Sequence, residues 1–125
     1  MGNGKVIPLF LLMLVAHVAH VLEEIWGRFW LIDAVYGLGW FLAANWLLFC
    51  IPVVLLYFVL QGKRPAYVLS MVYAVIMIFN GAGHNVATLV SGRYFGGFAG
   101  GYTGIALLLI GMPMLYYLWM ERPAR

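Results

Sequence analysis

The sequence predicts an all-α fold, a polytopic membrane protein built as a bundle of four transmembrane helices. Of its 125 residues, 66% are hydrophobic and only 9% are charged, and the mean hydropathy is +0.98. This composition is typical of polytopic membrane proteins and lies outside the range of water-soluble domains. The formal net charge is only +3, and no basic stripe with interleaved aromatic residues is present, so we expect no nucleic acid among the partners.

Four apolar stretches have the length of roughly 20 residues that a helix needs to cross the hydrocarbon core of a bilayer. We expect these helices at residues 6–26, 38–60, 66–90 and 98–119. Each of the three connections contains glycine or proline, residues that commonly end helices. No linker or internal repeat divides the chain, so residues 1–125 are expected to form one domain.

Lysine and arginine residues are distributed unevenly among the helix ends. Most of them lie at the N-terminus, in the second connection and at the C-terminus, whereas the first and third connections carry only Arg28 and Arg93. Positively charged loops tend to remain in the cytoplasm. Both termini are therefore predicted to be cytoplasmic, and we expect the chain in the cytoplasmic membrane of a bacterium.

The first predicted helix carries four ionisable side chains in its second half, which this orientation assigns to the outer half of the bilayer. They are His17, His20, Glu23 and Glu24. Each such group in hydrocarbon costs on the order of 3 kcal/mol or more, so intramembrane ionisable residues indicate a functional site. At the helical period, His17, His20 and Glu24 lie within about 60° of arc, and Glu23 widens the arc to about 120°. All four are expected to face the bundle interior, with Glu23 at the edge.

The third predicted helix runs in the same direction and carries a polar stripe at matching depth. Asn80, His84 and Thr88 recur at every fourth residue, and Gly81 and Gly83 permit close approach of a neighbouring helix. Further polar residues in the same layer come from the other helices and the third connection. The expected substrate contacts are Asn80, Thr88, Asn45, Tyr94 and Tyr102.

The segment His20-Val21-Leu22-Glu23-Glu24 resembles the motif that names the HXXEE domain family, a group of small predicted integral membrane proteins. The family pattern also includes a further histidine, for which His84 is the candidate, and a Tyr-x-Pro-Gly element. In this chain Tyr94 and Gly97 stand at the ends of the corresponding segment, and Gly96 replaces the proline. The resemblance covers most of the chain and implies an intramembrane site, but no particular activity.

The histidine and glutamate residues favour a metal centre. Imidazole and carboxylate ligands from His17, His20 and Glu24 on one helix and His84 on another suit a divalent transition metal, with zinc or iron the expected ions. His20 and Glu24 would also act in catalysis, and Glu23 would remain as a general acid or base. We therefore expect an enzyme that hydrolyses or oxidises a hydrophobic substrate, a membrane lipid or an isoprenoid-like molecule.

Three alternatives remain open at this point. One is a metal-free isomerase or cyclase, in which Glu23 and Glu24 divide the roles of acid and base and His20 or His84 relays the proton. Another is an ion or proton transporter or sensor, which would require a homo-oligomer to enclose a pathway. In the third, a glutamate pairs with Arg28 near the interface, and the histidines only hydrogen-bond to neighbouring helices.

Overall fold

The computed structural model describes residues 4–124, apart from the side chain of Tyr36, and nearly all of this part of the chain is helical. The helices are α1 (Val6–Trp26), α2 (Gly37–Leu60), α3 (Arg64–Ser91) and α4 (Gly101–Glu121). All four are long and apolar enough to cross a membrane. The predicted all-α, four-helix fold is confirmed, and the predicted helix limits differ from these by at most three residues.

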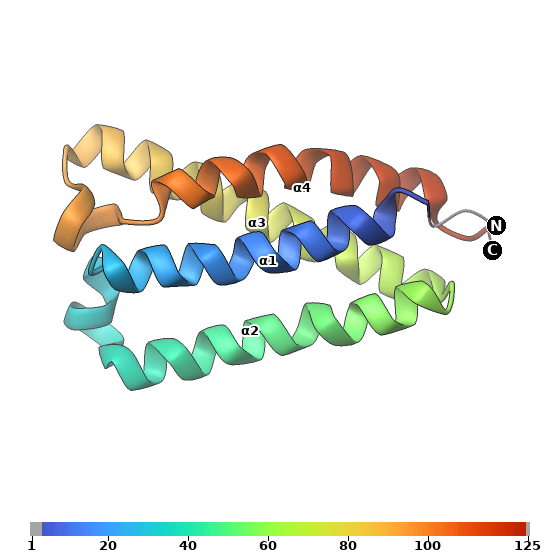
Figure 1. Cartoon of the computed structure of the whole chain (residues 1–125), viewed down its shortest axis with the longest axis horizontal. Helices are drawn as coiled ribbons and strands as arrows, with labels where there is room; N and C mark the ends of the chain where they lie inside the picture. Colours follow the sequence, from blue (N-terminus) through green and yellow to red (C-terminus); the bar gives the residue numbers. More distant parts are fainter. Residues whose placement is uncertain (1–3, 125) are drawn as a thin grey trace.

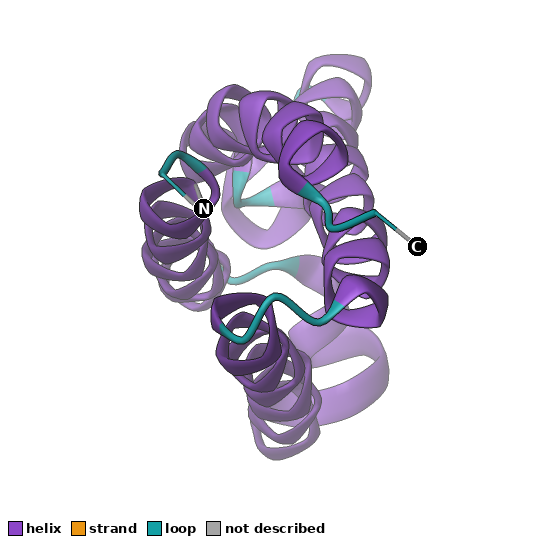
Figure 2. Cartoon of the chain, turned by 90° about the vertical axis from the view of Figure 1, so that its right-hand side faces the viewer, coloured by secondary structure: helices purple, strands orange, loops and turns teal. Residues whose placement is uncertain are grey.

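The four helices run up and down in sequence and form a ring when the bundle is viewed end-on (Figures 1 and 2). Each helix packs against the next, and α4 closes the ring against α1. The start of α1 and the end of α4 meet at one end of the bundle, where the backbone N–H of Lys5 lies 3.4 Å from Glu121 Oε1. The two described ends therefore lie on the same side of any membrane that the helices cross, as the even number of helices requires.

The α3–α4 pair is the most tightly packed because two glycines meet at the crossing. A Cβ atom on Gly81 would lie 2.3 Å from the Gly104 carbonyl oxygen, and one on Gly104 would lie 2.9 Å from the Gly81 carbonyl oxygen. Gly83, by contrast, faces open space. The close helix approach that the sequence predicted for both glycines therefore occurs at Gly81 and not at Gly83. At Gly81, α3 lies directly against the first turns of α4.

The connection between α3 and α4 follows an irregular path, which explains why α4 begins three residues later than predicted. Within Tyr94–Phe98, Phe95 is extended and Gly96 is left-handed, with φ of 65°. The Gly96 N–H donates a 2.9 Å hydrogen bond to the carbonyl of Gly27, directly after α1. A proline has no N–H and cannot adopt this φ, so glycine rather than proline suits this position.

The interior differs between the two ends of the bundle. Toward the termini it is mostly apolar and includes Phe10, Met13, Tyr67, Leu107 and Met114, with Ser70 as a buried polar residue. Toward the first and third connections the buried residues include His20, Glu23, Glu24 and His84. The polar groups of α1 and α3 thus share one layer, and a small apolar cluster of Phe29, Ile32 and Phe41 lies beside it.

Candidate metal centre

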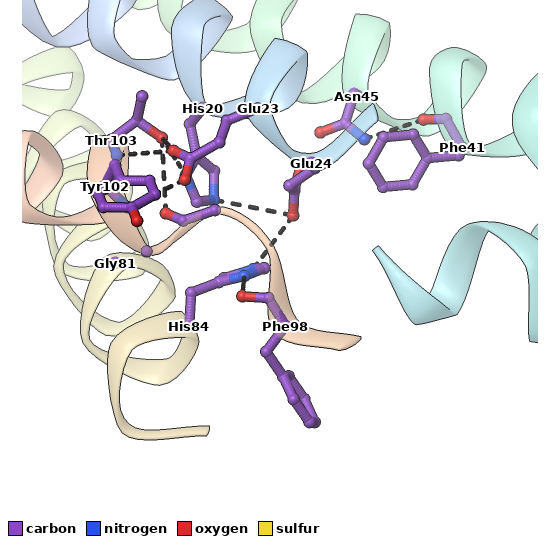
Figure 3. A network of polar contacts seen from close by, with 12 residues as sticks. His20, Glu23, Glu24, Phe41, Asn45, Gly81, His84, Phe98, Tyr102 and Thr103 are labelled. Atoms are coloured by element: carbon purple, nitrogen blue, oxygen red, sulfur yellow. Dashed lines mark hydrogen bonds and ion pairs between the residues drawn. The ribbon is translucent and has the colours of Figure 1, made fainter. Parts of the chain in front are cut away.

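Three ionisable side chains from α1 and α3 converge inside the polar layer (Figure 3). His20 and Glu24 lie one turn apart on α1, and His84 comes from α3. Glu24 Oε1 is 3.1 Å from His84 Nε2 and 3.7 Å from His20 Nε2. One ligand atom from each of the three residues lies within 4.8 Å of the others, and all three side chains are buried. This group is referred to below as the His-Glu-His cluster.

Hydrogen bonds on the far side of each imidazole determine which ring nitrogen faces the cluster. His84 Nδ1 lies 3.3 Å from the carbonyl oxygen of Phe98, and a carbonyl only accepts, so Nδ1 carries the hydrogen. Thr103 donates its hydroxyl hydrogen to Glu23 and therefore accepts from His20 Nδ1 at 3.0 Å. In the neutral rings both Nε2 atoms then present lone pairs toward Glu24. Metal-binding histidines typically have such an arrangement, in which the ring nitrogen that does not bind the metal donates a hydrogen bond to a neighbouring group.

Glu23 is adjacent in sequence to Glu24 but faces a different set of partners. Its Oε1 accepts hydrogen bonds from the Tyr94 hydroxyl and, at 3.0 Å, from the backbone N–H of Tyr102. Its Oε2 accepts from the hydroxyl of Thr103 and, at 2.7 Å, from the backbone N–H of the same residue. Four donors thus occupy the lone-pair positions of one carboxylate.

The backbone donors to Glu23 belong to the first turn of α4, where N–H groups have no partner within the helix. A carboxylate at this end of a helix also interacts favourably with the helix dipole. Glu23 therefore caps α4 across the bundle, and this arrangement leaves it no free position as a general base. The proposed ion pair with Arg28 is also absent from the described residues, because Arg28 pairs with the exposed Asp33 at 3.3 Å.

The Tyr94 hydroxyl, in the connection before α4, remains a hydrogen-bond donor to Glu23. Burial and the neighbouring Glu23 carboxylate raise the pKa of this hydroxyl above its ordinary value. Trp26 packs edge-on near the Tyr94 ring, with 6.5 Å between ring centroids. Tyr94 thus fastens the third connection to α1 and contacts no group of the His-Glu-His cluster.

His17 lies outside the cluster, although the sequence predicted it as a metal ligand. Its Nδ1 is 3.1 Å from the Tyr73 hydroxyl on α3, and its ring lies 6.1 Å from that of Phe49 on α2. The arc of about 60° that separates His17 from His20 around the helix is enough to direct the two rings to different neighbours. The structure therefore brings together three of the four predicted ligands.

The residues predicted to contact substrate have separate roles. The Thr88 hydroxyl donates to the carbonyl of Phe98 at 3.0 Å, which is the same oxygen that accepts from His84. The side chain of Tyr102 is exposed, and only its backbone N–H contacts Glu23. Asn80 is half-buried and makes no side-chain hydrogen bond within residues 4–124. None of these three reaches the His-Glu-His cluster directly.

Two residues that sequence reasoning did not assign to the site help to shape it. Thr103 links Glu23 to His20, as described above. Gly100 lies against both imidazoles, because a Cβ atom there would be 2.7 Å from His84 Nδ1 and 2.8 Å from His20 Cε1. Its φ of 123° is also one that side chains disfavour. The glycine-rich start of α4 was the only sequence signal for this role.

Aromatic rings cover the cluster toward the first and third connections. The ring of Phe29 lies 4.8 Å from that of His84, and Phe41 and Phe98 lie 6.4 and 6.3 Å from Phe29. His20 and His84 themselves pack edge to face, with ring centroids 4.8 Å apart. The ligand atoms are thus shielded from the ends of the helices, in surroundings of low polarity that strengthen electrostatic interactions.

Comparisons with protein-family models, curated proteins and solved structures find no match for this chain. The resemblance to the HXXEE family accordingly depends on the motif residues alone.

Proposed function

We propose that this protein is a membrane-embedded enzyme that uses a metal ion, held by His20, Glu24 and His84, to act on a hydrophobic substrate. The observation that carries the proposal is the convergence of two imidazole nitrogens and one carboxylate oxygen in a buried layer. Two histidines and a glutamate form a ligand set that suits zinc or non-haem iron and leaves coordination positions open.

The three ligand atoms of the cluster all accept hydrogen bonds, which favours a bound metal ion over a single shared proton. His84 Nε2 and Glu24 Oε1 are 3.1 Å apart and both accept, so one shared proton would satisfy this pair. The same proton would leave His20 Nε2 unsatisfied, since this buried nitrogen has no hydrogen-bond partner within residues 4–124. A cation bound by all three atoms would satisfy each of them.

The metal would supply Lewis-acid or redox chemistry at this site, so we propose metal-assisted hydrolysis or oxidation. The chain's own residues would orient the ligands: Thr103 and the Phe98 carbonyl hold the two rings, and Gly100 leaves room for both. The cluster lies between helices that are long enough to span a membrane. We therefore propose that the substrate arrives from the bilayer.

We also propose membership of the HXXEE family, with the motif divided between two roles. His20 and Glu24 would bind the metal, and Glu23 would hold α4 in place. The four hydrogen bonds to Glu23 support this division, since they leave that carboxylate no free position toward the cluster.

A metal-free acid–base enzyme is the second candidate, and one distance favours it. The separation of 3.1 Å between Glu24 Oε1 and His84 Nε2 is that of a hydrogen bond, so a proton shared by this pair would be available to an isomerase or cyclase. In that case the acid–base pair would be Glu24 and His84, because Glu23 is engaged with α4.

Metal content distinguishes the two candidates. The detergent-purified protein, prepared without chelators and supplied with zinc or ferrous iron, is analysed for metal per chain. We expect about one ion in the wild type, and far less in His20→Ala and Glu24→Gln. His17→Ala is the matched control, because His17 lies on the same helix outside the cluster and should retain the ion. A wild type that binds no metal would contradict the first proposal and favour the acid–base enzyme.

A further inference from the structure

A groove between α1 and α2 offers a second candidate site, apart from the His-Glu-His cluster. It has a volume of about 220 Å³ and is lined by apolar side chains such as Val21 and Trp46, with His17 and Asn45 as its polar residues. Sites that enclose a whole drug-sized ligand measure roughly 300–1,000 Å³. This groove therefore has room for one end of a long molecule.

The groove opens sideways, toward the surface that would face the bilayer. Leu22 on its α1 side and Trp46 on its α2 side are 61% and 67% exposed. Both belong to helices that are long and apolar enough to span a membrane. A molecule dissolved in the bilayer would therefore reach the groove directly, whereas the groove contains no charged side chain to attract an ionic group.

His17 presents a hydrogen-bond donor to the groove. The hydroxyl of Tyr73 is buried and needs an acceptor, and the acceptor within reach is His17 Nδ1 at 3.1 Å. If Nδ1 accepts, the neutral imidazole carries its hydrogen on Nε2. His17 is only 2% exposed, and no hydrogen bond within residues 4–124 uses this Nε2. Nε2 is therefore a donor without a hydrogen-bond partner among the described residues, on a side chain that lines the groove.

Asn45 presents the complementary acceptor. Its Nδ2 donates a 2.9 Å hydrogen bond to the carbonyl of Phe41 in the preceding turn of α2. This bond fixes the amide orientation, and Oδ1 has no partner among the described residues. A donor from α1 and an acceptor from α2 thus line the same apolar groove.

We infer that this groove binds the hydroxyl end of a neutral, long-chain alcohol from the bilayer. A hydroxyl both donates and accepts one hydrogen bond, which matches His17 Nε2 and Asn45 Oδ1. A plain hydrocarbon chain would leave both protein groups unpaired, which is unfavourable in buried surroundings. An ether would satisfy His17 alone.

The groove also bears on the proposed enzyme. His17 precedes His20 by three residues, a rise of roughly 4.5 Å along α1. To the extent that the proposed function holds, the alcohol in the groove belongs to the substrate class, and its hydroxyl binds about one turn from the metal ligands. Binding in the groove itself does not require the metal.

Photolabelling tests the inference. A C12 alcohol with a diazirine on its chain is added to the protein in nanodiscs, and labelled peptides are mapped by mass spectrometry. We expect labels on α1 and α2 around the groove, displaced by 1-dodecanol at least tenfold more effectively than by dodecyl methyl ether. His17→Phe and Asn45→Leu each remove one hydrogen-bonding group and should reduce this labelling at least tenfold.

Two control variants separate loss of alcohol binding from other effects of substitution. Asn80→Leu removes a membrane amide outside the groove and should label as the wild type does. His20→Ala should lose metal yet retain labelling, so failure of the metal proposal is distinguishable from failure of this one. Equal competition by the ether, or unchanged labelling in both His17→Phe and Asn45→Leu, would overturn the inference.

Discussion

The Glu23 carboxylate accepts two hydrogen bonds from Thr103, one from its backbone N–H at 2.7 Å and one from its hydroxyl. The same hydroxyl accepts from His20 Nδ1 at 3.0 Å. Through this one residue, the capping of α4 and the orientation of a candidate metal ligand depend on each other. The motif His20-x-x-Glu23-Glu24 therefore contains both a ligand pair and the group that holds one of those ligands.

Replacement of Thr103 tests this link. Thr103→Val removes the hydroxyl at nearly constant volume, so His20 loses the partner that fixes its tautomer. Loss of such a partner typically weakens metal binding about 10- to 100-fold. We expect a loss of this size for Thr103→Val and near wild-type affinity for Thr103→Ser, measured by competition with a chromophoric zinc chelator. Equal affinities in the two variants would show that Thr103 does not position His20.

Replacement of the adjacent residues Glu23 and Glu24 should have opposite effects on stability and metal binding. Glu23→Gln weakens hydrogen bonds to the first turn of α4, and bonds to a charged group contribute about 1.5–3 kcal/mol each. We expect the free energy of unfolding in detergent to fall by about 2 kcal/mol while metal stoichiometry is retained. Glu24→Gln should lose the metal and keep the stability of the metal-free wild type. Loss of metal with unchanged stability in Glu23→Gln would instead make Glu23 a ligand.

Gly100 should tolerate no side chain. Its φ of 123° and the contacts of 2.7 and 2.8 Å that a Cβ atom would make with His84 and His20 both oppose alanine. We expect Gly100→Ala to lower the unfolding temperature and to displace at least one ligand, with weaker metal binding as the readout. Gly83→Ala is the matched control on α3, since a Cβ atom there meets no neighbour and alanine favours helix by roughly 0.5–1 kcal/mol. Comparable metal binding in the two variants would contradict this account.

Hydropathy and helical period were sufficient to predict the helices and the polar layer. Span length identified all four helices, and the positions of His20, Glu24 and His84 placed them at one depth. Such reasoning works because the bilayer sets helix length and the helical period sets which side chains share a face.

The same reasoning could not assign partners within the layer. His17 and Glu23 fall within the inward arc, yet neither joins the cluster. His17 contacts Tyr73 on α3 and Glu23 contacts the first turn of α4, because the choice of partner depends on crossing geometry. Thr103 lies 80 residues from Glu23, and the irregular path of Tyr94–Phe98 determines where α4 begins. Neither relationship has a local sequence signal.

X-ray absorption of the zinc-loaded protein identifies the atoms that bind the metal. We expect a first shell of nitrogen and oxygen that includes two imidazoles, with one imidazole lost in His84→Ala and both retained in His17→Ala. A first shell that contains the Cys50 sulfur, or an imidazole count that falls in His17→Ala and not in His84→Ala, would contradict the assignment of His20, Glu24 and His84 as the metal ligands.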